Sequence, residues 1–145
     1  LLERLEKVPD SAKKHGIKRA IPLKVAGAYH SRLMESARVT LEAALRDAPV
    51  TMPRCPVVAN FSALPGNNPD EIRTLLLQQV TGTVRWEDSI RWLVAQQVQH
   101  FIEFGPGEVL AGLAKRIDPN LRVASVSDIA SLEKALEFAT AEGLG

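Results

Sequence analysis

The sequence has little of what marks membrane, disulfide-rich or metal-binding proteins. Its 145 residues include one cysteine, Cys55, so no disulfide can form within the chain, which favours a reducing, cytoplasmic compartment. No apolar run approaches the roughly 20 residues that a membrane helix needs, and charge begins at Glu3, too early for a signal peptide. Neither a metal-ligand spacing nor a nucleic-acid motif occurs. We therefore expect no membrane, metal or nucleic acid among its partners.

A serine nucleophile elbow is also missing. No Gly-x-Ser-x-Gly occurs anywhere in the chain. Ser31 directly follows His30, so it is poorly placed to give its proton to that histidine. The remaining serines lack the elbow context.

The overall composition is that of a globular domain. Hydrophobic residues make up 46% and charged residues 24% of the chain, and the net charge is +1. This mix argues against disorder, and the length suits one domain with a single core. A net charge so close to zero names no partner.

Apolar spacing predicts helices and strands in alternation from about residue 53 onward. The helices are expected over 1–15 with an interruption at Pro9, from 31 to Pro49, over 69–80 and 84–98, from 109 to 117, and after a cap at Ser131. The strands are expected over 18–25, 56–60, 99–104 and 121–126. Such alternation is typical of an α/β fold with largely parallel pairing.

Two short segments indicate where helices begin. Asn68, Pro69 and Glu71 fit the N-cap, first and third positions of a helix. Gly105-Pro106-Gly107 turns sharply from a strand into a helix, and we interpret its glycines as structural. A phosphate site at that helix start is the less favoured alternative.

Three segments, in order, resemble the malonyl-CoA:acyl-carrier-protein transacylase family. They read IPLKVAGAYHSRLM over 21–34, LQQV over 77–80 followed by VRW over 84–86, and FGPGEVL over 104–110 followed by LAKR over 113–116. The resemblance covers about residues 12–140 and is to the C-terminal half of the family. It implies the C-terminal part of an α/β-hydrolase-like large domain over 27–145, preceded over 1–26 by the end of a small ferredoxin-like insertion.

The resemblance assigns three site residues. His30 matches the histidine that activates the family's serine, with Tyr29 in place of a phenylalanine. Gln79 matches a glutamine at the active-site wall, where a main-chain carbonyl orients the imidazole. From the residues alone, an ordinary polar residue near a helix start is the favoured interpretation of His30, and the resemblance reverses that preference. Gln79 could equally be a solvated residue at a helix end, and a one-residue slip would put Gln78 in its place. The bulk of Tyr29 favours malonyl over methylmalonyl groups.

The resemblance also implies the reaction and the partners. Malonyl passes from coenzyme A to the phosphopantetheine thiol of an acyl carrier protein through a malonyl-serine intermediate, in fatty acid biosynthesis. No cofactor beyond these substrates is implied, and the complete protein is expected to be a cytoplasmic monomer. A basic cluster before His30 suits an acidic carrier protein, or is only a solvated face; it comprises Lys13, Lys14, Lys18, Arg19 and Lys24. The alternatives are a polyketide synthase acyltransferase domain or a non-catalytic truncated fragment.

Overall fold

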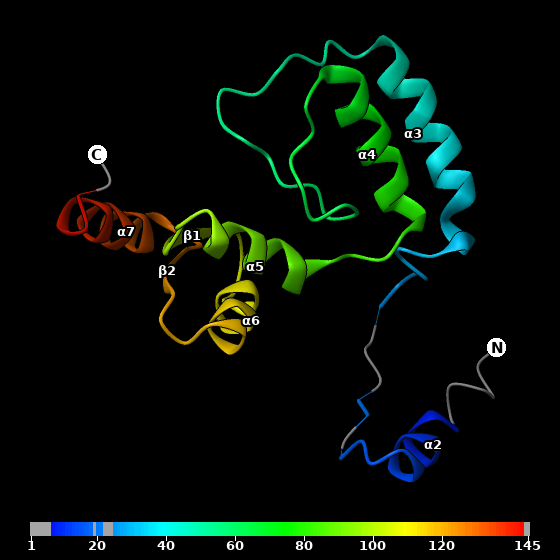
Figure 1. The fold of residues 1–145 in the computed structure, drawn as a ribbon, viewed down its shortest axis with the longest axis horizontal. Helices are drawn as coiled ribbons and strands as arrows, with labels where there is room; N and C mark the ends of the chain where they lie inside the picture. Colours follow the sequence, from blue (N-terminus) through cyan, green and yellow to red (C-terminus); the bar gives the residue numbers. More distant parts are fainter. Residues whose placement is uncertain (1–6, 19, 22–24, 144–145) are drawn as a thin grey trace.

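The computed structural model describes residues 7–18, 20–21 and 25–143 (Figure 1). The helices are α2 (Val8–Lys14), the 3-10 turn η1 (Arg32–Met34), α3 (Glu35–Asp47), α4 (Pro69–Thr81), α5 (Trp86–Ala95), α6 (Val109–Ile117) and α7 (Ile129–Ala141). The strands are β1 (His100–Phe104) and β2 (Arg122–Val126). No helix in the described ranges is long and apolar enough to cross a membrane.

Helix α2 shows how Pro9 is accommodated. Pro9 lies in the first turn of the helix, where its missing N–H costs no hydrogen bond. The interruption expected at Pro9 is therefore wrong for the described residues, because the helix begins at Val8 after Lys7 and continues through Pro9. Gly16, with a φ of +74°, follows its end.

The strand expected over 18–25 is not found where it can be examined. Ala20, Ile21 and Val25 have no strand conformation, and Ile21 and Val25 are exposed. The other positions of its two-residue apolar pattern, 22–24, lie outside the described residues, as does Arg19.

Helices α3 and α4 form an antiparallel pair that begins with η1 (Figure 1). The predicted cap of α4 is confirmed: Asn68 Oδ1 accepts a hydrogen bond of 2.9 Å from the N–H of Glu71, and Pro69 occupies the first turn. The helix then ends before Gly82, one residue beyond its expected end.

The loop between α3 and α4 replaces the strand expected over 56–60. Only one isolated antiparallel bridge forms there, between Val58 and Pro65. The chain turns back at once, because the N–H of Ala63 donates to the carbonyl of Ala59 at 2.9 Å. Val57 is 58% exposed, so the apolar run does not mark a buried strand here.

The C-terminal part holds the predicted parallel pairing and the core. Strands β1 and β2 pair in parallel, with His100 opposite Arg122 and Phe104 opposite Val126, and α6 connects them. The centre of the core is Ile90 of α5, Ala114 of α6 and Leu121, which directly precedes β2. Partly buried side chains pack around it, namely Trp86, Val94, Phe101, Ile117 and Val123.

Helix α7 is capped at its N-terminal end and contacts the sheet at its C-terminal end. Its cap is Asp128 and not Ser131 as expected; Ser131 is the third residue of a capping box, in which the N–H of Ser131 donates to Asp128 Oδ1 at 2.8 Å. At the other end, Glu142 contacts His100 Nε2 at 3.0 Å and pairs with Arg122. These contacts join the helix to the first residues of both strands.

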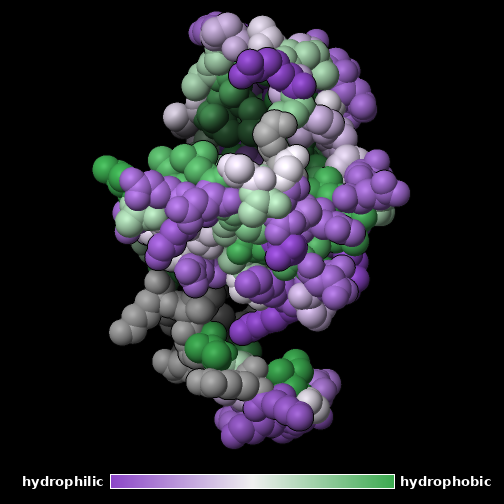
Figure 2. Space-filling view, turned by 90° about the vertical axis from the view of Figure 1, so that its left-hand side faces the viewer, coloured by the Kyte–Doolittle hydropathy of each residue, from purple (hydrophilic) through white to green (hydrophobic). Residues whose placement is uncertain are grey.

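The chain exposes much apolar surface. Its accessible area is 11295 Å², whereas a compact monomer of this mass exposes roughly 7,300 Å². Hydrophobic patches appear on the face shown in Figure 2. Among the most exposed large apolar side chains are Phe104, Val109 and Ile129, at 73%, 70% and 77%. A core of mainly small buried side chains must therefore support a large exposed surface.

We predict that the chain on its own has low stability. Burial of apolar surface is the main favourable contribution to folding, and the few buried apolar side chains offset the conformational entropy of ordering the chain only narrowly. Urea unfolding followed by circular dichroism should give a broad transition at low denaturant. A sharp cooperative transition at high denaturant would contradict this prediction.

We predict that the cap of α7 weakens in acid. Hydrogen bonds from the side chain and then the backbone of Ser131 hold the pKa of the Asp128 carboxyl below its usual range. A lowered pKa contributes stability that is present above the ordinary aspartate pKa and is lost as the pH falls through the lowered value. Titration by carboxyl ¹³C NMR should show the low pKa, and Ser131→Ala should raise it. An ordinary pKa in the unsubstituted protein would refute the interpretation.

Candidate functional site

His30 lies in a tight turn directly before η1. Its φ is +56°, in the left-handed region that few residues other than glycine adopt. The next residue, Ser31, is extended and is the N-cap of η1. This abrupt change of direction presents the exposed imidazole beside the end of α4.

The imidazole of His30 is bonded to the backbone of Gln79. Nδ1 lies 2.7 Å from the carbonyl oxygen of Gln79. That carbonyl is in the last turn of α4, where backbone oxygens have no partner within the helix. A carbonyl can only accept, so Nδ1 carries the proton in the neutral ring and Nε2 keeps its lone pair. The geometry therefore selects the tautomer in which Nε2 can accept a proton.

The structure separates Gln79 from its neighbour Gln78. The carbonyl of Gln78 accepts from the N–H of Gly82 at 2.9 Å, so it is already used in ending the helix. Gln79 is half-buried and lines a pocket of about 230 Å³ with the 57–60 segment, whereas Gln78 is exposed. Of the two, only the Gln79 carbonyl reaches His30.

Tyr29 lies beside His30 and is 57% exposed. Its ring folds over Gly27, where a Cβ atom would come within 3.4 Å of Tyr29 Cζ. The aromatic ring therefore occupies space over Gly27 that a small side chain at position 29 would leave open.

Ser31 has a structural task. Its hydroxyl donates to the carbonyl of Ala28 at 2.6 Å and accepts from the N–H of Leu33 at 3.3 Å. Both bonds stabilise the turn that carries His30. A nucleophilic role for Ser31 would require these contacts to break. This agrees with the sequence analysis, which found Ser31 poorly placed to be the nucleophile.

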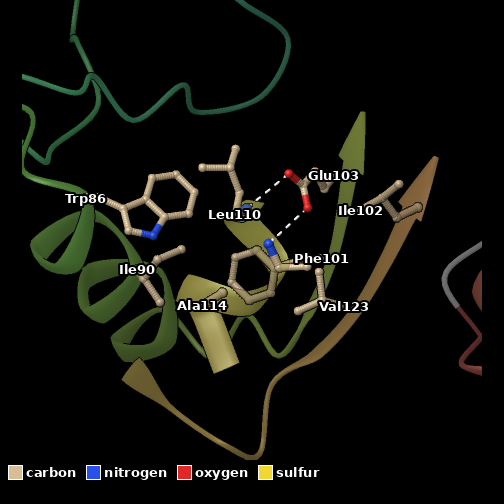
Figure 3. A pocket seen from close by; sticks show the side chains of 9 residues that line it. Trp86, Ile90, Phe101, Ile102, Glu103, Leu110, Ala114 and Val123 are labelled. Carbon is tan, nitrogen blue, oxygen red and sulfur yellow. Dashed lines mark hydrogen bonds between the residues drawn. The ribbon is translucent and has the colours of Figure 1, made fainter. Parts of the chain in front are cut away.

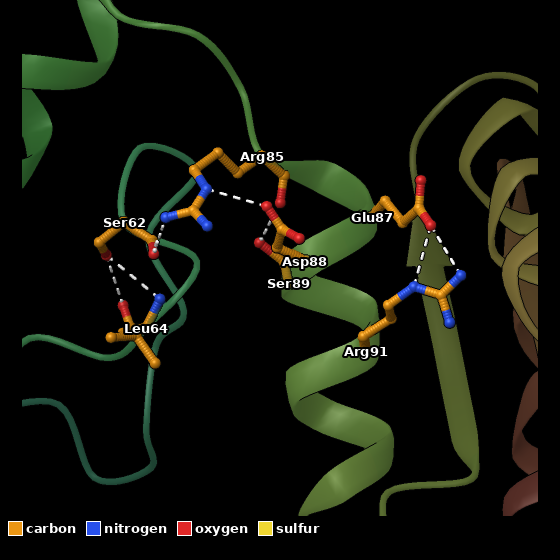
Figure 4. A network of polar contacts seen from close by, with 7 residues as sticks. All are labelled: Ser62, Leu64, Arg85, Glu87, Asp88, Ser89 and Arg91. Carbon is orange, nitrogen blue, oxygen red and sulfur yellow. Dashed lines mark hydrogen bonds and ion pairs between the residues drawn. The ribbon is translucent and has the colours of Figure 1, made fainter.

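Arg85 fixes the loop next to Gln79, a contribution that the sequence analysis missed (Figure 4). The backbone N–H of Arg85 donates to the Asn60 carbonyl at 2.8 Å. Its guanidinium donates to the Ser62 carbonyl at 3.2 Å and pairs with the Asp88 carboxylate at 2.9 Å. Arg85 thus ties the loop to the start of α5. The presence of Arg85 in the family-like VRW segment was the one sequence signal that could have drawn attention to it. Its contacts with the loop depend on the tertiary fold.

The Gly105–Gly107 turn connects β1 to α6, and residues of both elements, among them Glu103 and Leu110, line an apolar pocket of about 90 Å³ (Figure 3). Glu103 points from β1 to the start of α6, where its carboxylate accepts from the N–H groups of Leu110 at 3.1 Å and Ala111 at 2.9 Å. These donors are the ones that a phosphate would use. The turn is therefore structural, and its φ values of +138° and +87° require the two glycines.

Within the described ranges, no group of three or more His, Cys, Asp or Glu side chains could hold a metal ion. The site instead consists of one imidazole with a defined tautomer, a bulky neighbour in Tyr29, and a pocket behind Gln79. This arrangement can transfer a proton to and from a group that approaches Nε2.

Comparison with known proteins gives a consistent family. No protein-family model matches the chain. The malonyl CoA-acyl carrier protein transacylase of Bacillus subtilis is 39% identical over 133 residues, which are 92% of this chain and 42% of the relative. The solved acyl-carrier-protein S-malonyltransferase of Burkholderia pseudomallei is 43% identical with a TM-score of 0.83, over 91% of this chain and 43% of that one.

A further solved structure is a malonyl-transacylase in complex with a type II PKS acyl-carrier protein. It is 38% identical with a TM-score of 0.85, over 93% of this chain and 44% of that one. The chain thus spans less than half the length of the relatives it matches. The resemblance seen in the three sequence segments is confirmed: the chain is a homologue of the C-terminal part of the malonyl CoA-acyl carrier protein transacylases.

Proposed function

We propose that this chain is the histidine-bearing part of a protein that transfers malonyl from coenzyme A to the phosphopantetheine thiol of an acyl carrier protein. The observation that carries the proposal is the 2.7 Å contact between His30 Nδ1 and the Gln79 carbonyl. It leaves Nε2 free to act as a base and then as an acid. The similarity to malonyl transacylases over nearly the whole chain supports the same reaction.

The proposed reaction uses His30 twice in each half. Nε2 accepts the proton of a serine hydroxyl as its oxygen attacks the malonyl thioester carbon, and the C–S bond breaks. The departing coenzyme A sulfur then takes the proton from Nε2. In the second half, Nε2 accepts the proton of the phosphopantetheine thiol, whose sulfur attacks the malonyl-serine ester, and the serine oxygen recovers the proton.

Gln79 supports the charged intermediate in this proposal. When Nε2 is protonated, the imidazolium bears a full positive charge next to the Gln79 carbonyl. The C-terminus of α4 contributes a partial negative charge at the same point. A backbone carbonyl thus takes the place of the aspartate that orients the histidine in a triad.

The serine is proposed to lie in the part of the protein that corresponds to the rest of the relatives' length. We propose that it belongs to a hydrolase-like domain that residues 27–145 complete, and that residues 1–26 end a ferredoxin-like insertion. Such a further part of the protein could also cover the apolar surface that Phe104, Val109 and Ile129 expose. The complete protein is proposed to be a cytoplasmic monomer without a cofactor.

An acyl carrier protein is the proposed partner. Lys13, Lys14 and Lys18 are exposed, on and just after α2, and they would attract an acidic carrier protein. The solved neighbour bound to a carrier protein supports this partner, and its type II PKS origin keeps a polyketide pathway as the second candidate beside fatty acid biosynthesis.

The first test is intact mass spectrometry of the complete protein after incubation with malonyl-CoA. We expect the mass to rise by one malonyl group. His30→Ala should slow this acylation by about 10²–10⁴-fold, because it removes the general base. His15→Ala is the matched control and should acylate normally. No adduct on the unsubstituted protein would support a non-catalytic role.

A second test concerns the acyl group. Tyr29→Ser should raise the rate with methylmalonyl-CoA relative to malonyl-CoA, because the smaller side chain leaves room for the α-methyl group. Competition between the two thioesters, followed by mass spectrometry of the acyl-protein, measures the ratio. An unchanged ratio would remove the steric account of Tyr29 and leave the transfer reaction itself unaffected.

A further inference from the structure

The α3–α4 pair is closed at both ends by contacts of the same kind. At one end, His30, before α3, bonds to the carbonyl of Gln79 in the last turn of α4. At the other end, Arg73, near the start of α4, bonds to carbonyls at the end of α3. In both cases a side chain in or next to one helix bonds to backbone oxygens at the C-terminal end of the other helix.

Arg73 makes its contacts with a rigid, forked group. Nε donates to the Leu45 carbonyl at 3.1 Å, and Nη2 donates to the Ala48 carbonyl at 2.7 Å. Two bonds from one planar guanidinium define both the distance and the direction of its partner. The positive charge also lies at the negative end of the α3 dipole, where cations are favoured.

The position of Arg73 on α4 allows it to influence where His30 lies relative to Gln79. Arg73 and Gln79 are six residues apart on α4, which is about 9 Å along a helix axis. A helix is stiff over such a distance, so a shift of α3 along α4 at the Arg73 end also shifts the turn that holds His30. A shift of about 1 Å is enough to lengthen the Nδ1 bond beyond ordinary hydrogen-bond range.

We infer that Arg73 is a positioning residue for His30, and that it sets the register of α3 against α4 at which Nδ1 reaches the Gln79 carbonyl. The inference rests on the proposed function for its effect on rate. Its effect on the tautomer of the imidazole does not depend on that function.

Arg38 offers a matched control on the same helix pair. Its side chain is 31% exposed, close to the 26% of Arg73. Arg38 pairs with Glu35 and Glu42 of its own helix. Arg73 also pairs within its helix, with Asp70 at 3.5 Å, but it alone of the two bonds to carbonyls of the other helix. Removing Arg38 therefore changes charge and local helix stability without removing a bond between α3 and α4.

The experiment compares Arg73→Met, Arg73→Lys and Arg38→Met in the complete protein, below the unfolding temperature of each. Long-range ¹H–¹⁵N NMR of the imidazole reports which nitrogen of His30 carries the proton. Arg73→Met should produce a mixture of tautomers and lower kcat for malonyl transfer by about 10- to 100-fold, with KM for malonyl-CoA changed by less than about twofold. Arg73→Lys should restore part of both effects, and Arg38→Met should change neither.

Two results would separate the failures. If the unsubstituted protein transfers no malonyl group, the proposed function fails, while the NMR comparison still tests Arg73. If transfer occurs and needs His30, but Arg73→Met lowers only the unfolding temperature, Arg73 has a structural role alone and the inference is overturned. An equal loss of the tautomer in Arg38→Met would overturn it as well.

Discussion

The hydrogen bond between His30 Nδ1 and the Gln79 carbonyl is the contact on which the site depends. It joins residues 49 positions apart and requires three conditions at once. The α4 helix must end so that the Gln79 oxygen is free, the chain at His30 must adopt a positive φ, and α3 must lie at the correct height along α4. A failure of any one condition would leave an exposed imidazole with no fixed tautomer.

Much of the remaining polar structure maintains these conditions. Ser31 uses its hydroxyl to stabilise the turn after His30, and Asn68 caps the start of α4. Arg73 bonds α4 to the end of α3, and Arg85 fixes the loop that lines the pocket behind Gln79. The apolar core, by contrast, is in the C-terminal part around Ile90 and Ala114. The site is therefore held largely by directional hydrogen bonds, which specify geometry more sharply than apolar packing does.

The exposed apolar surface and the site have a common explanation under the proposed function. Phe104, Val109 and Ile129 are open to solvent at the ends of the parallel strands, and the chain spans less than half the length of its relatives. A histidine prepared to accept a proton, without a nucleophile in the same chain, likewise calls for a further part of the protein. Under the proposed function, the same further part of the protein would bury the surface and complete the chemistry.

Features that depend only on residues close together in the chain could be predicted from the sequence. The Asn68 cap, the parallel βα units of the C-terminal part and the family-like segments around His30 and Gln79 were all predicted, because periodicity, caps and motifs are local signals. The other features depend on contacts between distant parts of the chain. The 56–60 segment has a strand-like apolar pattern but turns back on itself, since a strand also needs a partner. The contacts of Arg73 and Arg85 join segments more than 20 residues apart, and no local pattern encodes which carbonyl a distant guanidinium will meet.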